Sequence, residues 1–144
     1  MLKRLIKLNL CALMVVLCAT PIQASTIAAT NAAQLAEEWG IQLMDLRLSA
    51  AGYMLDFRYR VLDADKANSL LLRKNKPKLT IQSTGRELAV PVPPKLGPMR
   101  QTTRKVKADT NYFIFFGNPA RQVKSGDKVN IKIGDLEITG LKVS

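Results

Sequence analysis

The most regular pattern in the chain is the stretch GYMLDFRYRVLD at residues 52–63. One set of its alternating positions holds Tyr53, Leu55, Phe57, Tyr59 and Val61. The other set holds Met54, Asp56, Arg58, Arg60 and Leu62. Because successive side chains of a β-strand point to opposite faces, this period of two predicts a strand with one face packed in a core and the other mostly in water.

Further strand patterns surround this stretch and are separated by turn residues. They lie at residues 41–49, 78–82, 86–92, 101–107, 111–116, 128–133 and 136–143. Parallel strands need a long crossover between them, so these closely spaced segments favour antiparallel sheets. We predict an all-β fold, namely an immunoglobulin-like antiparallel β-sandwich of about seven or eight strands with one or two short helices. A small β-barrel is the alternative.

Two local features add detail to this fold. Asp63 is placed to cap a short helix that ends at Leu71. The aromatic segment 111–116 has Phe113 and Phe115 on one face, and if both faces are apolar it is a central strand covered on both sides. An aromatic wall of a ligand groove is the functional alternative for this segment.

Residues 1–24 have the features of a secretory signal peptide. Three basic residues, Lys3, Arg4 and Lys7, precede a nearly unbroken apolar stretch at residues 8–19. We predict cleavage before Ser25, with Ala28 as an alternative site. The predicted location is the periplasm, and the alternative is retention in the inner membrane by an uncleaved leader.

The predicted organisation has three parts: the leader at 1–24, a tether or short helix at 25–39 and the β-sandwich domain at 40–144. Residues 25–31 are small and polar and predict a tether, whereas apolar residues recur at helical spacing from Ala32 to Trp39. An extended lead-in is the alternative to this short helix.

Composition excludes several kinds of catalytic site. The chain has no His, and both cysteines, Cys11 and Cys18, fall in the leader. An imidazole base, a His-ligated zinc ion and a thiolate nucleophile are therefore excluded after cleavage. Ser125 and Lys128 have the spacing of a lysine-activated serine, but Gly126 between them favours a turn. Asp63 with Asp65 could begin a calcium site, although helix capping explains both. We predict no enzymatic activity, no cofactor and no metal.

The positive charge of the chain is regional. The chain carries 22 Lys and Arg against 11 Asp and Glu, and residues 66–107 hold eleven basic residues against one acidic residue, Glu87. Such a patch attracts polyanions. The predicted partner-binding residues form two clusters, Arg73, Lys74, Lys76 and Lys78, and Arg100, Arg104, Lys105 and Lys107. The alternative is that these residues only solvate strand ends and block edge pairing.

The predicted partner is an anionic surface, such as lipid headgroups or acidic polysaccharide, or an envelope protein. Nucleic acid is disfavoured, because export separates the chain from it and no aromatic residue lies among the basic residues of 66–107. The segment 91–109 is long for a loop and rich in proline, so we expect it to contact the partner unless it contains a further strand.

The sequence thus predicts a non-enzymatic exported binding or accessory domain that docks through its basic loop region. A structural or assembly subunit that pairs through a sheet edge is the alternative. The oligomeric state is left open.

Four segments carry a resemblance to a known family. They are residues 39–41, 52–63, 112–119 and 125–129, which read WGI, GYMLDFRYRVLD, YFIFFGNP and SGDKV. Together they resemble a family of small exported bacterial proteins of unknown function. The similarity covers residues 39–143 and includes no catalytic motif. It implies an exported single domain and nothing about activity.

Overall fold

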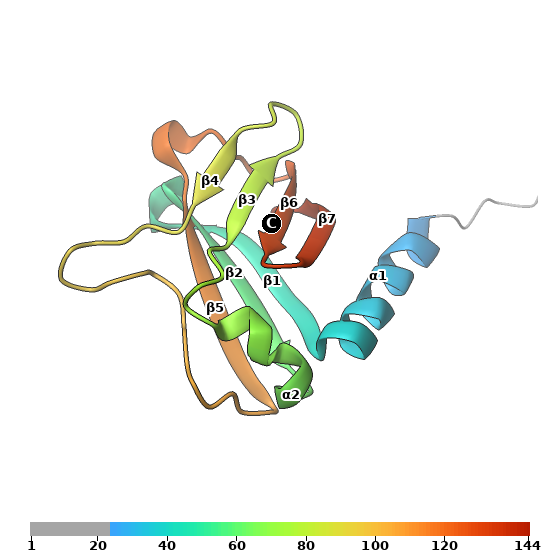
Figure 1. Ribbon diagram of the computed structural model, residues 1–144. Helices are drawn as coiled ribbons and strands as arrows, with labels where there is room; N and C mark the ends of the chain where they lie inside the picture. The colour runs from blue at the N-terminus through green and yellow to red at the C-terminus, as the bar shows by residue number, and fades with distance from the viewer. Residues whose placement is uncertain (1–23) are drawn as a thin grey trace, which may run out of the picture.

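Seven β-strands form the body of the protein in a computed structural model, which describes residues 24–144 and the side chains of residues 32–144 (Figure 1). The predicted leader therefore lies outside the described residues, apart from Ala24. The strands are β1 Ile41–Ser49, β2 Met54–Val61, β3 Lys78–Ile81, β4 Glu87–Ala89, β5 Thr110–Gly117, β6 Lys128–Ile133 and β7 Leu136–Lys142. The helices are α1 Ala24–Trp39 and α2 Ala64–Ala67, and three short 3₁₀ segments are η1 Ala50–Gly52, η2 Asn68–Leu71 and η3 Pro119–Arg121.

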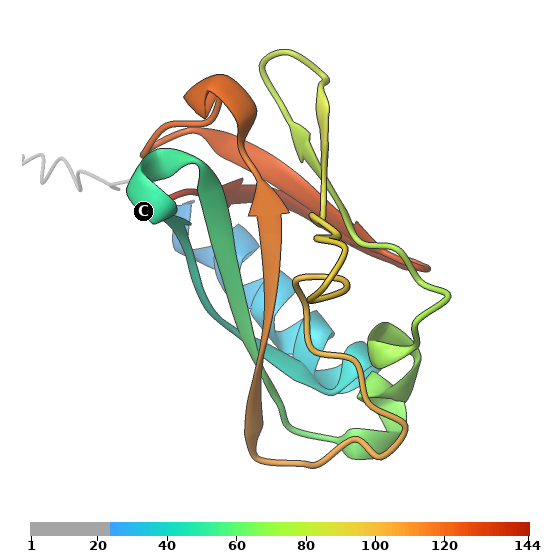
Figure 2. The same ribbon diagram turned by 90° about the vertical axis from the view of Figure 1, so that its left-hand side faces the viewer.

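The strands form two separate antiparallel sheets, which confirms the predicted β-sandwich. One sheet has the order β1-β2-β5 and the other β4-β3-β6-β7. Figures 1 and 2 show them as two layers. The alternative of one closed sheet is wrong, since no strand of the first sheet pairs along its length with a strand of the second.

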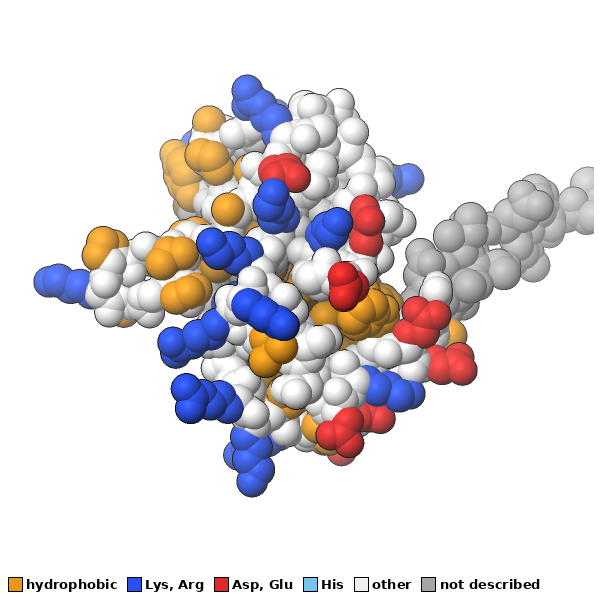
Figure 3. Space-filling model, in the orientation of Figure 1, with side chains coloured by type: hydrophobic (Ala, Val, Ile, Leu, Met, Phe, Trp, Pro, Cys, Tyr) orange, Lys and Arg blue, Asp and Glu red, His pale blue; other side chains and the backbone are white. Residues whose placement is uncertain are grey.

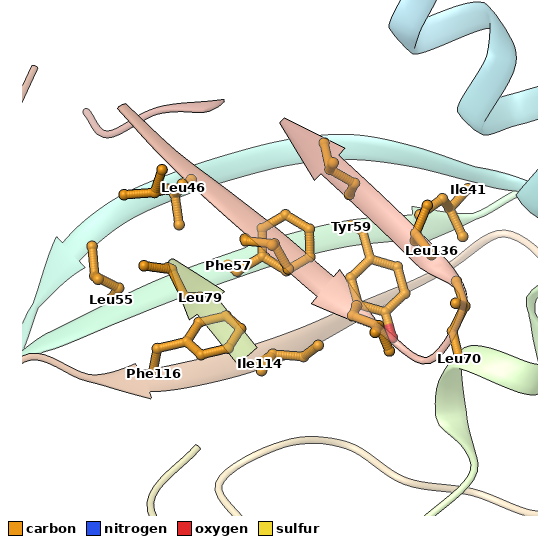
Figure 4. Packing of buried hydrophobic residues seen from close by; sticks show 14 of the residues in the cluster. Ile41, Leu46, Leu55, Phe57, Tyr59, Leu70, Leu79, Ile114, Phe116 and Leu136 are labelled. Carbon is orange, nitrogen blue, oxygen red and sulfur yellow. The ribbon is translucent and has the colours of Figure 1, made fainter. Parts of the chain in front are cut away.

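The hydrophobic core lies between the two sheets (Figure 4). The alternation predicted for β2 holds for Leu55, Phe57, Tyr59 and Val61, which are all buried. Tyr53 precedes the strand and is exposed, with the guanidinium of Arg121 lying 5.1 Å from its ring centre. The first sheet contributes its aromatic residues to the core, while aliphatic residues of β3, β6 and β7 face them.

Asp56 departs from the prediction that the outer face of β2 is mostly in water. It is only 2% exposed. Arg58 on the same strand donates to it from Nε at 2.9 Å, and Arg47 lies opposite on β1 with Nη2 at 3.4 Å from the carboxylate. The two long side chains cover the short acidic one, so a charged residue is buried on the solvent side of the sheet.

Helix α1 is longer than the sequence predicts. It begins at Ala24, so residues 25–31, for which the sequence predicts a tether, lie within the helix. The segment contains many alanines and no Gly or Pro before Gly40, and alanine has the highest helix propensity. Gly40 ends the helix with φ +62°, and its amide donates to the carbonyl of Ala36 at 3.2 Å.

The short helix after β2 is capped as predicted. Oδ1 of Asp63 accepts hydrogen bonds from the amides of Asp65 and Lys66 at 3.0 and 3.2 Å. Helix α2 and η2 follow and end at Leu71. The hairpin predicted at 78–92 is also present as β3 and β4, although β4 stops at Ala89.

Strand β5 lies at an edge of its sheet, not at the centre as predicted. Its inner face is buried, and Phe113 and Phe115 on the outer face are half-buried, with ring centres 5.2 Å apart. The strand predicted at 101–107 is wrong, because only a single bridge joins Arg100 to β5. Backbone bonds from Phe115 to Met99 and from Gln101 to Phe113 cover part of this edge.

Candidate functional site

Two basic segments that are distant in the sequence line one groove. The first is the basic turn, residues 72–78, which runs from the end of η2 to the first residue of β3. The second is the proline loop, residues 90–109 between β4 and β5. Three adjoining hollows of about 260, 400 and 460 Å³ lie between them, and Arg73 lines all three. We call these hollows together the basic groove. Its cationic lining consists of Arg73, Lys76, Lys78, Arg100 and Arg104.

The topology of the second sheet and the anchoring of the proline loop bring these segments together. The basic turn leads into β3, and β4 leads out of the same hairpin into the proline loop. The loop then crosses to the first sheet, where the bridge from Arg100 to Ile114 fixes it beside β5. The basic groove is therefore formed where the chain passes from one sheet to the other.

Arg100 is the buried cation of the groove. It is 9% exposed, and its Nη2 donates to the carbonyl of Leu72 at 2.6 Å, which ties the proline loop to the basic turn. No carboxylate of the described residues forms an ion pair with it. Burial lowers the pKa of this guanidinium, and nearby Tyr59 partly offsets the effect. The side chain still remains charged at neutral pH, because a guanidinium is not deprotonated in proteins under such conditions.

The remaining predicted partner-binding residues are exposed. Lys78 forms an exposed ion pair with Glu87 at 2.8 Å. The other six are exposed and form no ion pair within the part of the chain that the structure describes: Arg73, Lys74, Lys76, Arg104, Lys105 and Lys107. Lys74, Lys105 and Lys107 lie outside the lining of the groove.

On the face drawn in Figure 3, most of the acidic side chains lie apart from the cations of the basic groove. In Figure 3, Lys and Arg side chains gather at the left, over the proline loop and the basic turn, and most of the visible acidic side chains lie at the right. Glu38, Asp135 and Glu137 line a hollow of about 260 Å³ between α1 and β7. Among the described residues, no Asp or Glu lines the basic groove. This separation makes the groove side electropositive.

The groove also has apolar walls, which no sequence pattern predicts. Val92 and Leu96 from the proline loop line it and are 64% and 79% exposed. Leu72 of the basic turn lines its other end. Length, proline content and basic residues are the sequence signals that mark this segment, and exposure of individual aliphatic residues in a loop has no sequence pattern.

The other candidate sites of the sequence have structural roles. Asp63 is occupied by helix capping, and no three acidic side chains of the described residues gather in a way that could hold a metal ion. Ser125 and Lys128 flank a turn in which Oδ2 of Asp127 accepts from the amide of Lys124 at 2.9 Å. Phe113 and Phe115 lie on the outer face of β5 and line none of the hollows described here.

Comparisons with protein-family models, with curated proteins and with solved structures give no match. Among residues 24–144, no helix is long and apolar enough to cross a membrane.

Tyr59, which lies near Arg100, should make the free energy of unfolding depend on pH. Burial raises the pKa of its hydroxyl above the ordinary value of about 10, and the charge of Arg100 only partly offsets this rise. Above pH 10 the unfolded chain therefore releases a proton that the folded chain keeps, and rising pH favours unfolding. We expect the wild type to lose up to about 1.4 kcal/mol per pH unit there relative to Tyr59→Phe.

Urea unfolding of both proteins between pH 8 and 11 measures this difference. Below pH 9 the gap in unfolding free energy between wild type and Tyr59→Phe should be constant. If the unfolding free energies of the two proteins differ by the same amount at every pH up to 11, the prediction is contradicted. Tyr53→Phe, which removes an exposed hydroxyl, is the control.

Proposed function

We propose that this chain is an exported, non-enzymatic binding domain that docks on an anionic partner through the basic groove. The observation that carries the proposal is Arg100, a cation that is nine-tenths buried in a groove with no acidic lining residue. Burial of a charge without a counter-charge is unfavourable, and an anion in the groove would compensate it. The unpaired cations at the rim would attract that anion from a distance.

Export to the periplasm belongs to the same proposal and depends on the leader pattern of residues 1–24. The partners available there are anionic lipid headgroups, acidic polysaccharide and acidic faces of envelope proteins. The absence of His from the whole sequence supports a binding role, because imidazole is the most common general base in enzymes.

Assembly by strand pairing has less support. The outer edge of β1 is bonded to Ser144, whose amide donates to Leu46 and whose carbonyl accepts from Leu48. The outer edge of β5 is partly covered by the proline loop. Strand β4 has three residues, and β7 carries an irregularity opposite the segment from Val129 to Ile131. Short and irregular edge strands disfavour pairing with another chain.

Retention on immobilised heparin tests the proposal. The wild type should bind at low salt and elute with moderate salt, because the attraction is electrostatic. The variant Arg73→Glu/Lys76→Glu should elute at clearly lower salt. The control Lys128→Glu/Lys142→Glu changes the net charge equally, but its residues lie opposite each other at the far end of β6 from the groove.

The comparison between the two variants decides the result. An elution shift confined to Arg73→Glu/Lys76→Glu supports docking at the groove. Equal shifts in both variants would show that net charge alone causes retention, and the proposal would then fail. Absence of wild-type retention at low salt would refute it directly.

A further inference from the structure

The tip of the proline loop exposes the two most solvent-accessible large apolar side chains of the described residues. We define the loop tip as Pro91–Met99. Val92 and Leu96 within it are 64% and 79% exposed, more than any other large hydrophobic residue of residues 32–144. Figure 1 shows the loop extending from the body of the sandwich. Exposed apolar area is unfavourable in water, so two such side chains on a projecting loop indicate a surface that another apolar phase covers.

The loop tip has a defined conformation. The amides of Leu96 and Gly97 donate to the carbonyl of Pro93 at 3.2 and 2.9 Å. At its base the amide of Met99 donates to the carbonyl of Pro91 at 2.9 Å. Prolines restrict the rest of the tip. The two aliphatic side chains are therefore presented by an ordered turn, which reduces the conformational entropy lost on binding.

Cations lie beside these apolar side chains. Leu96 shares one hollow with Arg73 and Arg100, and Val92 shares another with Lys76 and Arg100. In Figure 3 the projecting part at the left is orange with blue at its end, and further blue side chains lie on the body beside it. The surface thus combines the projecting side chains of Val92 and Leu96, which we call the apolar wedge, with cations beside them.

We propose that this surface docks peripherally on a bilayer that contains anionic phospholipid. Val92 and Leu96 enter the boundary between headgroups and acyl chains. Arg104 and the cationic side chains of the basic turn contact lipid phosphates. This inference rests on the proposed function and names its partner. An acidic polysaccharide would neutralise the cations but leave the two aliphatic side chains in water, whereas an anionic bilayer accommodates both.

Co-sedimentation with vesicles tests the inference. The wild type should bind vesicles of phosphatidylglycerol and phosphatidylcholine and should bind vesicles of phosphatidylcholine alone much more weakly. Val92→Ser/Leu96→Ser should weaken binding to the anionic vesicles about tenfold, from the loss of two buried aliphatic groups. Arg73→Glu/Lys76→Glu should weaken it about thirtyfold or more.

Two controls separate this inference from the proposed function. Met44→Ser/Leu62→Ser removes two exposed apolar side chains outside the loop tip and should bind vesicles like the wild type. Val92→Ser/Leu96→Ser should keep wild-type retention on heparin, because its charge is unchanged. Loss of vesicle binding with heparin retention intact is the signature of an apolar wedge.

The remaining outcomes overturn the membrane-docking inference, the proposed function or both. Retention on heparin without binding to anionic vesicles would refute membrane docking and leave the proposed function standing. Equal vesicle binding by the wild type and Val92→Ser/Leu96→Ser would also refute the inserted wedge. Failure to bind both vesicles and heparin would refute both.

Discussion

Replacing Gly40 by alanine is expected to lower the free energy of unfolding by about 4 kcal/mol. Gly40 has φ +62° at the end of α1, a conformation that is unfavourable for a residue with a Cβ atom. An added Cβ would also lie 2.7 Å from Cβ and 2.8 Å from the carbonyl oxygen of Asp63. The carbonyl of Gly40 accepts hydrogen bonds from the amides of Leu62 and Asp63 at 2.7 and 3.1 Å, so the clash disturbs the junction of α1, β2 and α2.

The matched control is Gly85→Ala. Gly85 has φ +69°, but no atom lies within 4 Å of the place where its Cβ would be. This variant isolates the conformational penalty, about 1–2 kcal/mol. Urea unfolding of both variants measures the two losses. Similar losses at both positions would contradict the steric argument for Gly40.

Replacing Asn118 by alanine is expected to destabilise the fold to a similar extent. Asn118 is fully buried, and its Nδ2 donates to the carbonyls of Gly52 and Val123, both at 2.9 Å. Its Oδ1 accepts from the amide of Val123 at 3.0 Å. Truncation leaves these backbone groups without their partner, and each buried unsatisfied group costs about 1–3 kcal/mol. Urea unfolding should show a loss of about 4 kcal/mol.

Asn118→Asp tests the cause of this loss. The carboxylate keeps an acceptor for Val123 but faces two carbonyl oxygens where the amide donated. It should therefore be strongly destabilised at neutral pH and partly recover in acid, when a protonated carboxyl can donate once. Asn111→Ala, on the exposed face of β5, should change stability by no more than about 0.5 kcal/mol. A small loss in Asn118→Ala would contradict the proposed role of the side chain.

The sequence predicts the parts of the fold that depend on local periodicity and turn chemistry. The alternation at 52–63 predicts β2 and its buried face, and Asp63 predicts a helix cap. The burial of Asp56 depends instead on Arg47, a residue of another strand, and the position of β5 at an edge depends on sheet order. Neither the partner strand nor the sheet order has a signal within the segment itself.

The candidate site, like the fold, is predicted only in part from local sequence patterns. Charge density marks the basic turn and the segment around Arg100, and both line the groove. The sequence does not distinguish the buried Arg100 from the exposed Arg104, because burial comes from the hydrogen bond to Leu72 and the packing of the loop beside β5. Nor does it mark Val92 and Leu96 as exposed, since apolar residues beside prolines are equally compatible with packing inward.

Trp39 gives the molecule an intrinsic optical probe. It is the only tryptophan of the sequence and is half-buried where α1 meets the core, in a hollow that it shares with Leu136 and Ile138. Its fluorescence spectrum therefore reports whether α1 is seated on the sandwich, without any added label. Because α1 and the loop tip lie on opposite sides of the molecule (Figure 1), a lipid surface that covers the tip leaves this indole untouched. An emission change on mixing with vesicles would then indicate a rearrangement that reaches through the whole domain.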